Sequence, residues 1–180
     1  MLVCDSNLRI RAIDATHPGV CHDAFIWNIS DLRSEMEQNY LQSHSNVRLL
    51  GDAGYPLEPW LLTPYRTPES GSPEAKFNEV HTRCRNIIER TNGVLKNRWR
   101  CILSARELYY SPAKAIKIIN VCAALHNICI HYKSEANLPT PYDNGYLNEN
   151  PTLENRHIGQ ENSTYMVAGQ RIRTEITNTL

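Results

Sequence analysis

The chain has 180 residues, of which 41% are hydrophobic and 21% are charged. This length suits one domain of ordinary size, and the composition predicts a packed core rather than a long disordered protein. Nineteen basic and nineteen acidic residues cancel, which taken alone argues against a nucleic-acid binder that works through a charged tail. Charges interrupt the longest apolar stretches and the first residues lack the pattern of a signal peptide, so we expect no membrane span and no secretion.

The six cysteines predict free thiols rather than disulfides. Several of them fall on apolar faces of helical patterns: Cys84 lies beside Ile87 and Ile88, and Cys122 and Cys129 lie two turns apart on one stripe. Buried free thiols behave as small hydrophobic groups, so we expect reduced cysteines in an intracellular protein. No C-x-x-C pair occurs, which argues against a cysteine zinc site.

The N-terminal third predicts a hairpin, a helix and two short strands. Residues 2–4 and 8–15 are short β-type runs around a turn-like segment, and the second alternates in polarity, so together they predict a β-hairpin. Residues 23–36 have a helical pattern, within which Ser30 is a candidate cap for a second piece. Residues 47–50 and 60–65 are short apolar runs that predict strands.

The rest of the chain predicts two long helices and a polar tail. Ser72 is a candidate N-cap of the first helix, which is expected to end near Arg98. Pro112 begins the second helix, and we expect it to be buried because apolar residues cover most of its circumference. Residues 135–163 are expected to be mostly irregular, and 168–179 to form a short helix.

The neutral total charge hides a strong asymmetry along the chain. Residues 76–117 contain ten basic residues against three acidic ones, a net charge of +7, and the remainder carries −7. A segregated basic segment is the pattern expected of a phosphate-binding face. A solvated helix face is the alternative interpretation.

Two acidic residues stand where catalytic groups are commonly placed. Asp52 follows a predicted buried strand and precedes a tight turn, which is where open α/β sheets place active sites. Glu89 lies mid-helix beside the apolar face. If the two carboxylates converge, they can hold Mg²⁺ or Mn²⁺ for phosphodiester cleavage. The alternative is that Asp52 caps its turn. Glu89 would then pair with Arg85 or Arg90.

Four blocks of sequence occur in a fixed order along residues 2–133. They are Pro-Gly followed by His-Asp within 17–24, Gly-Asp-Ala-Gly-Tyr-Pro-Leu at 51–57 with its continuation to 65, the segment 77–99 around Glu89, and Ala-Ala-Leu-His-Asn at 123–127. Together they resemble PIF/Harbinger-type DDE transposases and the nucleases derived from them. The ordered blocks are far more specific than either carboxylate alone.

This resemblance implies an α/β fold of the RNase H-like type, a mixed sheet flanked by helices with a carboxylate metal site. By position, Asp52 corresponds to the family's second acid and Glu89 to its third. Both are therefore expected to be catalytic and to hold Mg²⁺ or Mn²⁺. The residues expected to meet the DNA backbone are Arg85, Arg90, Lys96 and Arg98.

The N-terminal end of the match departs from the family pattern. The family's first aspartate lies on the first strand of the fold, ahead of the hairpin, and this chain starts at the hairpin. Neither Asp5 nor Asp14 lies where it could fill that position. The resemblance thus implies that residues 1–133 form a partial endonuclease domain without its first strand and one metal ligand, and that 134–180 form a polar tail.

The function expected from the resemblance is divalent-metal-dependent hydrolysis of DNA phosphodiesters, impaired by the missing aspartate. The expected location is the nucleus, with the cytoplasm second. The expected partners are DNA and a separate DNA-binding protein, not a membrane. The alternative is an inactive remnant of a domesticated transposase that binds DNA or protein. A third interpretation is a fragment without an independent fold.

Overall fold

Short strands and helices make up the part of the chain that the computed structural model describes, residues 1–18, 21–43, 47–103, 110–134 and 163–180. The α/β class predicted from the sequence is confirmed. The elements in chain order are β1 (Leu2–Cys4), β2 (Ile10–Ile13), α1 (Asp23–Asn28), α2 (Asp31–Leu41), β3 (Leu49–Leu50), β4 (Leu61–Leu62), α3 (Pro73–Arg98), the 3₁₀ turn η1 (Arg100–Ile102), α4 (Pro112–His131) and α5 (Ser163–Thr177).

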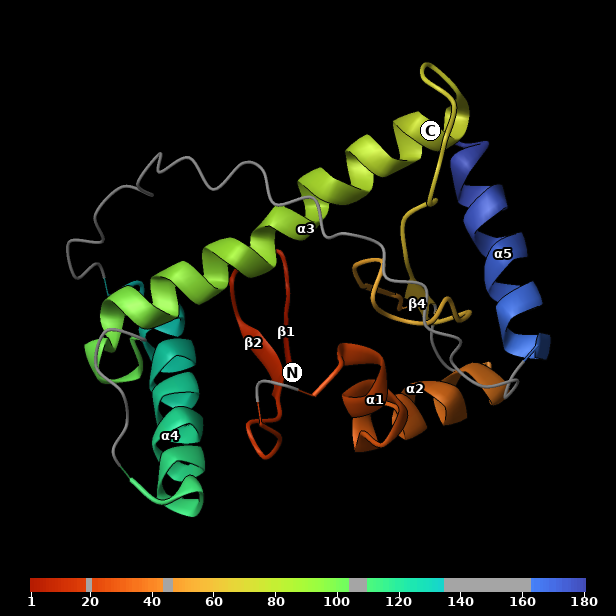
Figure 1. Cartoon of the computed structure of the whole chain (residues 1–180). Helices are drawn as coiled ribbons and strands as arrows, with labels where there is room; N and C mark the ends of the chain where they lie inside the picture. Colours follow the sequence, from red (N-terminus) through yellow and green to blue (C-terminus); the bar gives the residue numbers. More distant parts are fainter. Residues whose placement is uncertain (19–20, 44–46, 104–109, 135–162) are drawn as a thin grey trace.

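Helix α3 extends across the molecule and connects two separate apolar cores (Figure 1). Its C-terminal half packs with the β1–β2 hairpin and α4, and its N-terminal half with β3 and α5. The buried residues of the first core are Ile10, Leu95, Cys122 and Ala123. Those of the second core are Trp27, Trp60 and Leu61.

The strands form two small sheets, where the sequence predicted a single mixed sheet. β1 and β2 are antiparallel, with Leu2 opposite Ile13. β3 and β4 are parallel, with Leu49 opposite Leu61. Within the described residues β1 and β3 do not pair with each other, and in Figure 1 β1 lies on the side of the hairpin nearer β4.

The strand predicted over 60–65 is much shorter than expected. Only Leu61 and Leu62 pair with β3, because the backbone beyond them is used elsewhere. Pro64 has no N–H to offer a strand, and the N–H and C=O of Tyr65 both bond the side-chain amide of Asn78 at 2.8 Å.

The helix boundaries follow the capping signals. Ser30 Oγ accepts a hydrogen bond from the Arg33 N–H at 3.1 Å, so the pattern over 23–36 is split into α1 and α2 at the cap that the sequence suggested. Ser72 Oγ caps α3 by accepting from the Ala75 N–H at 3.2 Å. The predicted end of that helix at Arg98 is confirmed.

Helix α4 is far more exposed than its composition predicted. Its buried residues are Cys122, Ala123 and His126, while Val121 and Ile128 are 57% and 50% exposed. The expectation of a buried helix was wrong: among the described elements the main contacts of α4 are with β2 and α3, and these leave Val121 and Ile128 exposed. By length and composition alone α4 could also cross a membrane, but the core helix of a soluble protein can have the same length and composition.

The cysteines are free, as predicted, but most are not buried. Cys122 is buried, whereas Cys84 and Cys101 are exposed. The expectation that Cys84 is buried was wrong. Cys84 lies seven residues from both Phe77 and Thr91 and so shares their face of α3, but it lies between the packed stretches of this helix and its thiol is exposed.

Helix α5 packs against the domain at the end of β4. It begins at Ser163, five residues before the predicted start. Arg173 Nη1 donates to the carbonyls of Thr63 and Pro64 at 2.9 and 3.1 Å, and its guanidinium lies over the Tyr65 ring at 3.8 Å. The predicted irregular tail before it lies outside the described residues.

Candidate functional site

Asp52 stands immediately after β3, in the tight turn predicted from the sequence. Its Oδ1 accepts a hydrogen bond from the Gly54 N–H at 2.8 Å, and its backbone carbonyl accepts from the Tyr55 N–H at 3.2 Å. The side chain therefore caps the turn, as the alternative interpretation expected. Its other oxygen, Oδ2, is directed at α3.

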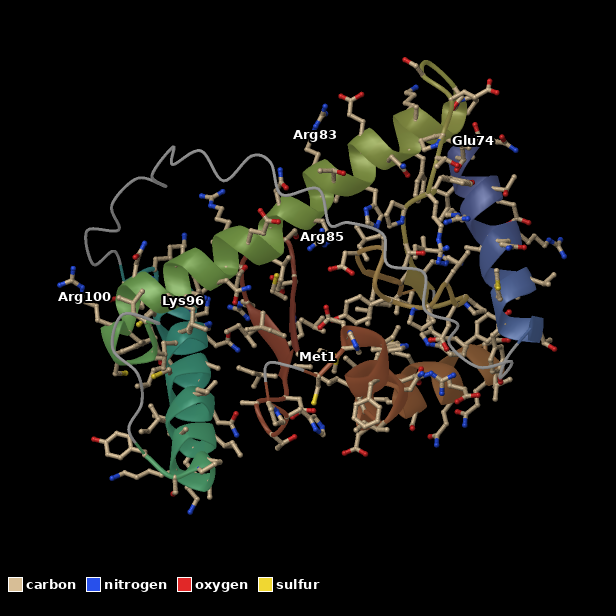
Figure 2. The ribbon with its side chains drawn as sticks, viewed as in Figure 1. Met1, Glu74, Arg83, Arg85, Lys96 and Arg100 are labelled. Atoms are coloured by element: carbon tan, nitrogen blue, oxygen red, sulfur yellow. The ribbon has the colours of Figure 1, made fainter. Side chains whose placement is uncertain are left out.

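Arg85 of α3 is the nearest charged partner of Asp52. The distance from Arg85 Nη2 to Asp52 Oδ2 is 3.8 Å, and the two side chains are 32% and 38% exposed. Figure 2 shows Arg85 extending from the side of α3 that faces the rest of the fold, while Arg83 extends from the opposite side. The structure thus joins the end of β3 to the middle of α3 through an open ion pair.

Glu89 lies one helical turn after Arg85. Residues four apart share a helix face, so Glu89 is on the side of α3 that carries Arg85. Its side chain is exposed, and within the described residues no ion pair links it to Arg85 or Arg90. The alternative pairing of Glu89 with an arginine is therefore not seen within the described residues. Arg85 lies beside Asp52 and one helical turn before Glu89.

Tyr55 brings a third acid, Asp23, to the edge of this site. Burial, and after it the charges of Asp23 and Asp52, raise the pKa of Tyr55 to about 12. The ring packs on Trp27 in a T-shaped arrangement with centroids 6.4 Å apart. A Cβ at Gly51 would come within 3.1 Å of Tyr55, so this glycine leaves room for the ring beside Asp52.

Several residues of the resembling blocks have a packing role instead of a chemical one. His81 of α3 donates from Nε2 to the Leu62 carbonyl at 3.2 Å, and burial lowers its pKa. His126 of α4 donates from Nε2 to the Leu8 carbonyl at 2.8 Å. The side-chain amide of Asn127 bonds both the N–H and the C=O of Ile10 at 2.8 Å. Asn78 makes the same pair of hydrogen bonds with the backbone of Tyr65.

The histidines and asparagines that tie α3 and α4 to the strands are thus hydrogen-bonded to backbone groups, and His126 is fully buried. Asp52, Arg85 and Glu89 take no part in these contacts and lie at the end of β3 and along the middle of α3.

The predicted DNA-contacting residues follow the length of α3. Arg90 and Lys96 are exposed, and Figure 2 shows Lys96 and Arg100 toward the C-terminal end of this helix. Arg98 is different: it is half-buried, and its Nη1 lies 3.5 Å from His126 Nδ1. Its Nε is buried without a partner within the described residues, so Arg98 belongs to the junction of α3 and α4.

The acids present are of the right kind for a divalent cation but too few. Carboxylate oxygens suit Mg²⁺ and Mn²⁺, and Asp52 and Glu89 supply two groups. Across the described residues no set of three or more His, Cys, Asp or Glu side chains lies close enough to hold a metal ion, and Arg85 occupies the open oxygen of Asp52. Within the part of the chain that the structure describes, these residues do not make a complete metal site.

One buried acid was missed by the sequence reasoning. Glu58 is 3% exposed and accepts from Trp27 Nε1 at 2.8 Å and from Arg33 Nη2 at 2.7 Å. It stands within the apolar run from Leu57 to Leu62. An acid in such a run signals a buried, paired carboxylate, and its role here is structural.

Comparison with known proteins adds a family match over most of the described chain. Residues 1–127 match the family model described as "DDE superfamily endonuclease". The chain is 33% identical to "Putative nuclease HARBI1" of Bos taurus over 133 residues, 73% of this chain and 37% of that protein.

Two further relatives match the chain at a similar identity. The protein of the same name from Mus musculus is 31% identical over 178 residues, 98% of this chain and 48% of the relative. "Protein ALP1-like" of Arabidopsis thaliana is 30% identical over 145 residues, 74% of this chain and 35% of the relative. The chain therefore spans less than half the length of the relatives it matches. No solved structure matches it significantly.

Proposed function

Because the chain belongs to the DDE superfamily endonucleases, we propose that it forms part of a nuclease domain that hydrolyses DNA phosphodiesters with divalent metal ions. The observation that carries the proposal is the placement of Asp52 at the end of β3, facing the side of α3 that bears Arg85 and Glu89. Enzymes of this family typically use divalent metals, which supports the choice of cofactor.

In this proposal Asp52 and Glu89 supply two of the carboxylates that hold Mg²⁺ or Mn²⁺. When bound, such ions activate water and stabilise the leaving oxygen of a phosphodiester. Arg85 holds the Asp52 carboxylate in place until metal and substrate compete for it. A third carboxylate is needed, and we propose that it lies on a further strand in an RNase H-like sheet, between β1 and β3. The free edges of those two strands support this arrangement.

The exposed basic residues of α3 are proposed to bind the DNA backbone. Arg90 and Lys96 are solvent-accessible, and neither forms an ion pair with a described acid. Lysine and arginine side chains without an acidic partner release counterions when they meet phosphates, which favours binding. Arg90 and Lys96 are six positions apart and therefore project from different sides of α3. We place the protein with its DNA in the nucleus, and a separate DNA-binding protein remains a proposed partner.

A second candidate function is DNA binding without cleavage. Arg85 beside Asp52 favours it, because a cation within 3.8 Å of a carboxylate neutralises the charge that a metal would need. The exposed basic residues of α3 would then bind DNA without any chemistry at the acids.

Cleavage of a labelled DNA duplex by the purified chain, with Mn²⁺ or Mg²⁺, tests the first candidate against the second. Asp52→Asn and Glu89→Gln keep shape and remove charge, so we expect either change to abolish cleavage while binding persists.

Arg90→Glu and Lys96→Glu are expected to weaken binding and to reduce the salt slope by about 1 for each lost phosphate contact. Binding is measured by fluorescence anisotropy over a salt series.

Arg171→Glu is the matched control for the charge reversals, because it changes the charge equally at an exposed position of a different helix, α5. Cleavage that survives both acid substitutions overturns the assignment of the site. Because the first candidate needs a third carboxylate beside Asp52 and Glu89, the unchanged chain is also tested for Mn²⁺ binding. Mn²⁺ binding that either acid substitution removes supports the first candidate, and DNA binding without Mn²⁺ binding favours the second. Failure to bind DNA at low salt counts against both.

A further inference from the structure

Two cysteines meet where α3 turns into α4. Cys101 lies on η1, directly after the end of α3, and Cys122 lies in the middle of α4. Their Sγ atoms are 3.9 Å apart. A disulfide needs about 2.0 Å between the sulfurs, so a small rotation of the two side chains would bring them to bonding distance.

The two thiols differ in their access to solvent. Cys101 is exposed, whereas Cys122 is buried in the first core beside Ala123. Burial, with the hydrogen bond to Cys101, raises the pKa of Cys122 to about 11. An oxidant from solvent therefore reaches Cys101 first, and the buried Cys122 is the second thiol, which can react with the oxidised Cys101.

We propose that Cys101 and Cys122 form a reversible disulfide when the protein meets a peroxide. The Cys101 thiolate attacks a peroxide oxygen, the O–O bond breaks, and the other oxygen leaves as water, which yields a sulfenic acid. Cys122 Sγ then attacks the sulfur of this acid, the S–O bond breaks, and a second water leaves with the Cys122 proton. The thiols lose two electrons and the peroxide gains them.

The bond would fasten η1 to α4 at one end of the basic helix. Trp99, which precedes η1, and Ile102, its last residue, pack against the core that contains Cys122, so the two thiols lie in a packed region. Lys96 and Arg100 lie at the same end of α3 (Figure 2). Oxidation would therefore reduce the freedom of the segment that carries these two cations. A thiol-based reductant would restore the pair.

The experiment treats the full chain with hydrogen peroxide, blocks remaining thiols, and analyses it by mass spectrometry after proteolysis. The expected result is a peptide that links Cys101 to Cys122 and has lost the mass of two hydrogen atoms, with reversal by dithiothreitol. The melting temperature should rise on oxidation, because the cross-link restricts the unfolded chain. Cys101→Ser should abolish both effects.

Cys84→Ser is the matched control. Cys84 is exposed like Cys101, but it does not take part in the contact between Cys101 and Cys122. This variant should still form the bond. Cys122→Ala keeps an apolar side chain in the core and should leave Cys101 to oxidise further, to the sulfinic acid. The proposal is overturned if Cys101 in the unchanged chain goes to the sulfinic acid without linking to Cys122, or if the link joins two different chains.

Discussion

Glu58 is a buried carboxylate that bonds Trp27 of the second core. Its carboxylate receives the Trp27 indole N–H and two bonds from Arg33, to the same Oε1 at 2.9 and 2.7 Å. Arg33 is itself largely covered, with 13% of its side chain exposed. A buried charge is tolerated only when its partners are in place, so this group holds α1, α2 and β4 in one arrangement.

Glu58→Gln should lower the free energy of unfolding by about 1.5–3 kcal/mol, because hydrogen bonds to a buried charge are replaced by weaker neutral ones. Chemical denaturation measures the change. Glu79→Gln is the control: Glu79 pairs with Arg83 on the surface, at 70% exposure, and such pairs contribute at most about 1 kcal/mol. Equal effects of the two substitutions would contradict the structural role given to Glu58.

Helix α5 is docked through its one glycine. A Cβ on Gly169 would lie 3.0 Å from the carbonyl carbon of Glu58 and 3.1 Å from its oxygen, so only glycine lets the helix approach this backbone. Thr177 adds a hydrogen bond to the Tyr65 hydroxyl at 3.0 Å. Close packing explains a glycine in the middle of a helix, where it is otherwise unfavourable.

Gly169→Ala should destabilise the protein, even though alanine favours the helical state by about 1 kcal/mol, because the added methyl group collides with backbone. Gly93→Ala in α3 is the same substitution in open space, with no atom within 4 Å of the new Cβ, and should stabilise. Denaturation midpoints give the two signs. Faster proteolysis at α5 in the first variant would show that this helix has detached. Stabilisation by both substitutions would contradict the docked position of α5.

At the scale of the whole molecule, α3 is the main connection between two cores. The hairpin and α4 pack on one half of it, and β3, β4 and α5 on the other half (Figure 1). The strands of the two halves do not share hydrogen bonds within the described residues. Two cores connected in this way are expected to open separately, since local stability follows local packing.

Leu95→Ala should therefore weaken one half selectively. Leu95 is 4% exposed in the first core, and such a deletion costs about 2–5 kcal/mol. Native-state hydrogen exchange should become faster in β2 and α4 and change little in β4 and α5. Leu61→Ala in the second core should produce the reverse pattern. Equal acceleration in both halves would show that the sheets are coupled.

Much of the secondary structure and the position of the acids could be read from the sequence. Ser72 and Ser30 mark helix starts through a hydroxyl that accepts a nearby N–H, and this is a local interaction. Asp52 likewise caps its own turn through Gly54. The exposure of α4 could not be read, because composition records how apolar a helix is and not how many neighbours cover it.

The sequence by itself determined the α/β class, the capped starts of α2 and α3 and the family, since these depend on local hydrogen bonding, periodicity and ordered motifs. Only the tertiary structure decided that Arg85 faces Asp52, that Gly169 meets Glu58, and that Cys101 meets Cys122. Each of these contacts joins residues from different elements. Their proximity depends on how the helices pack around α3, and no spacing along the chain encodes that distance.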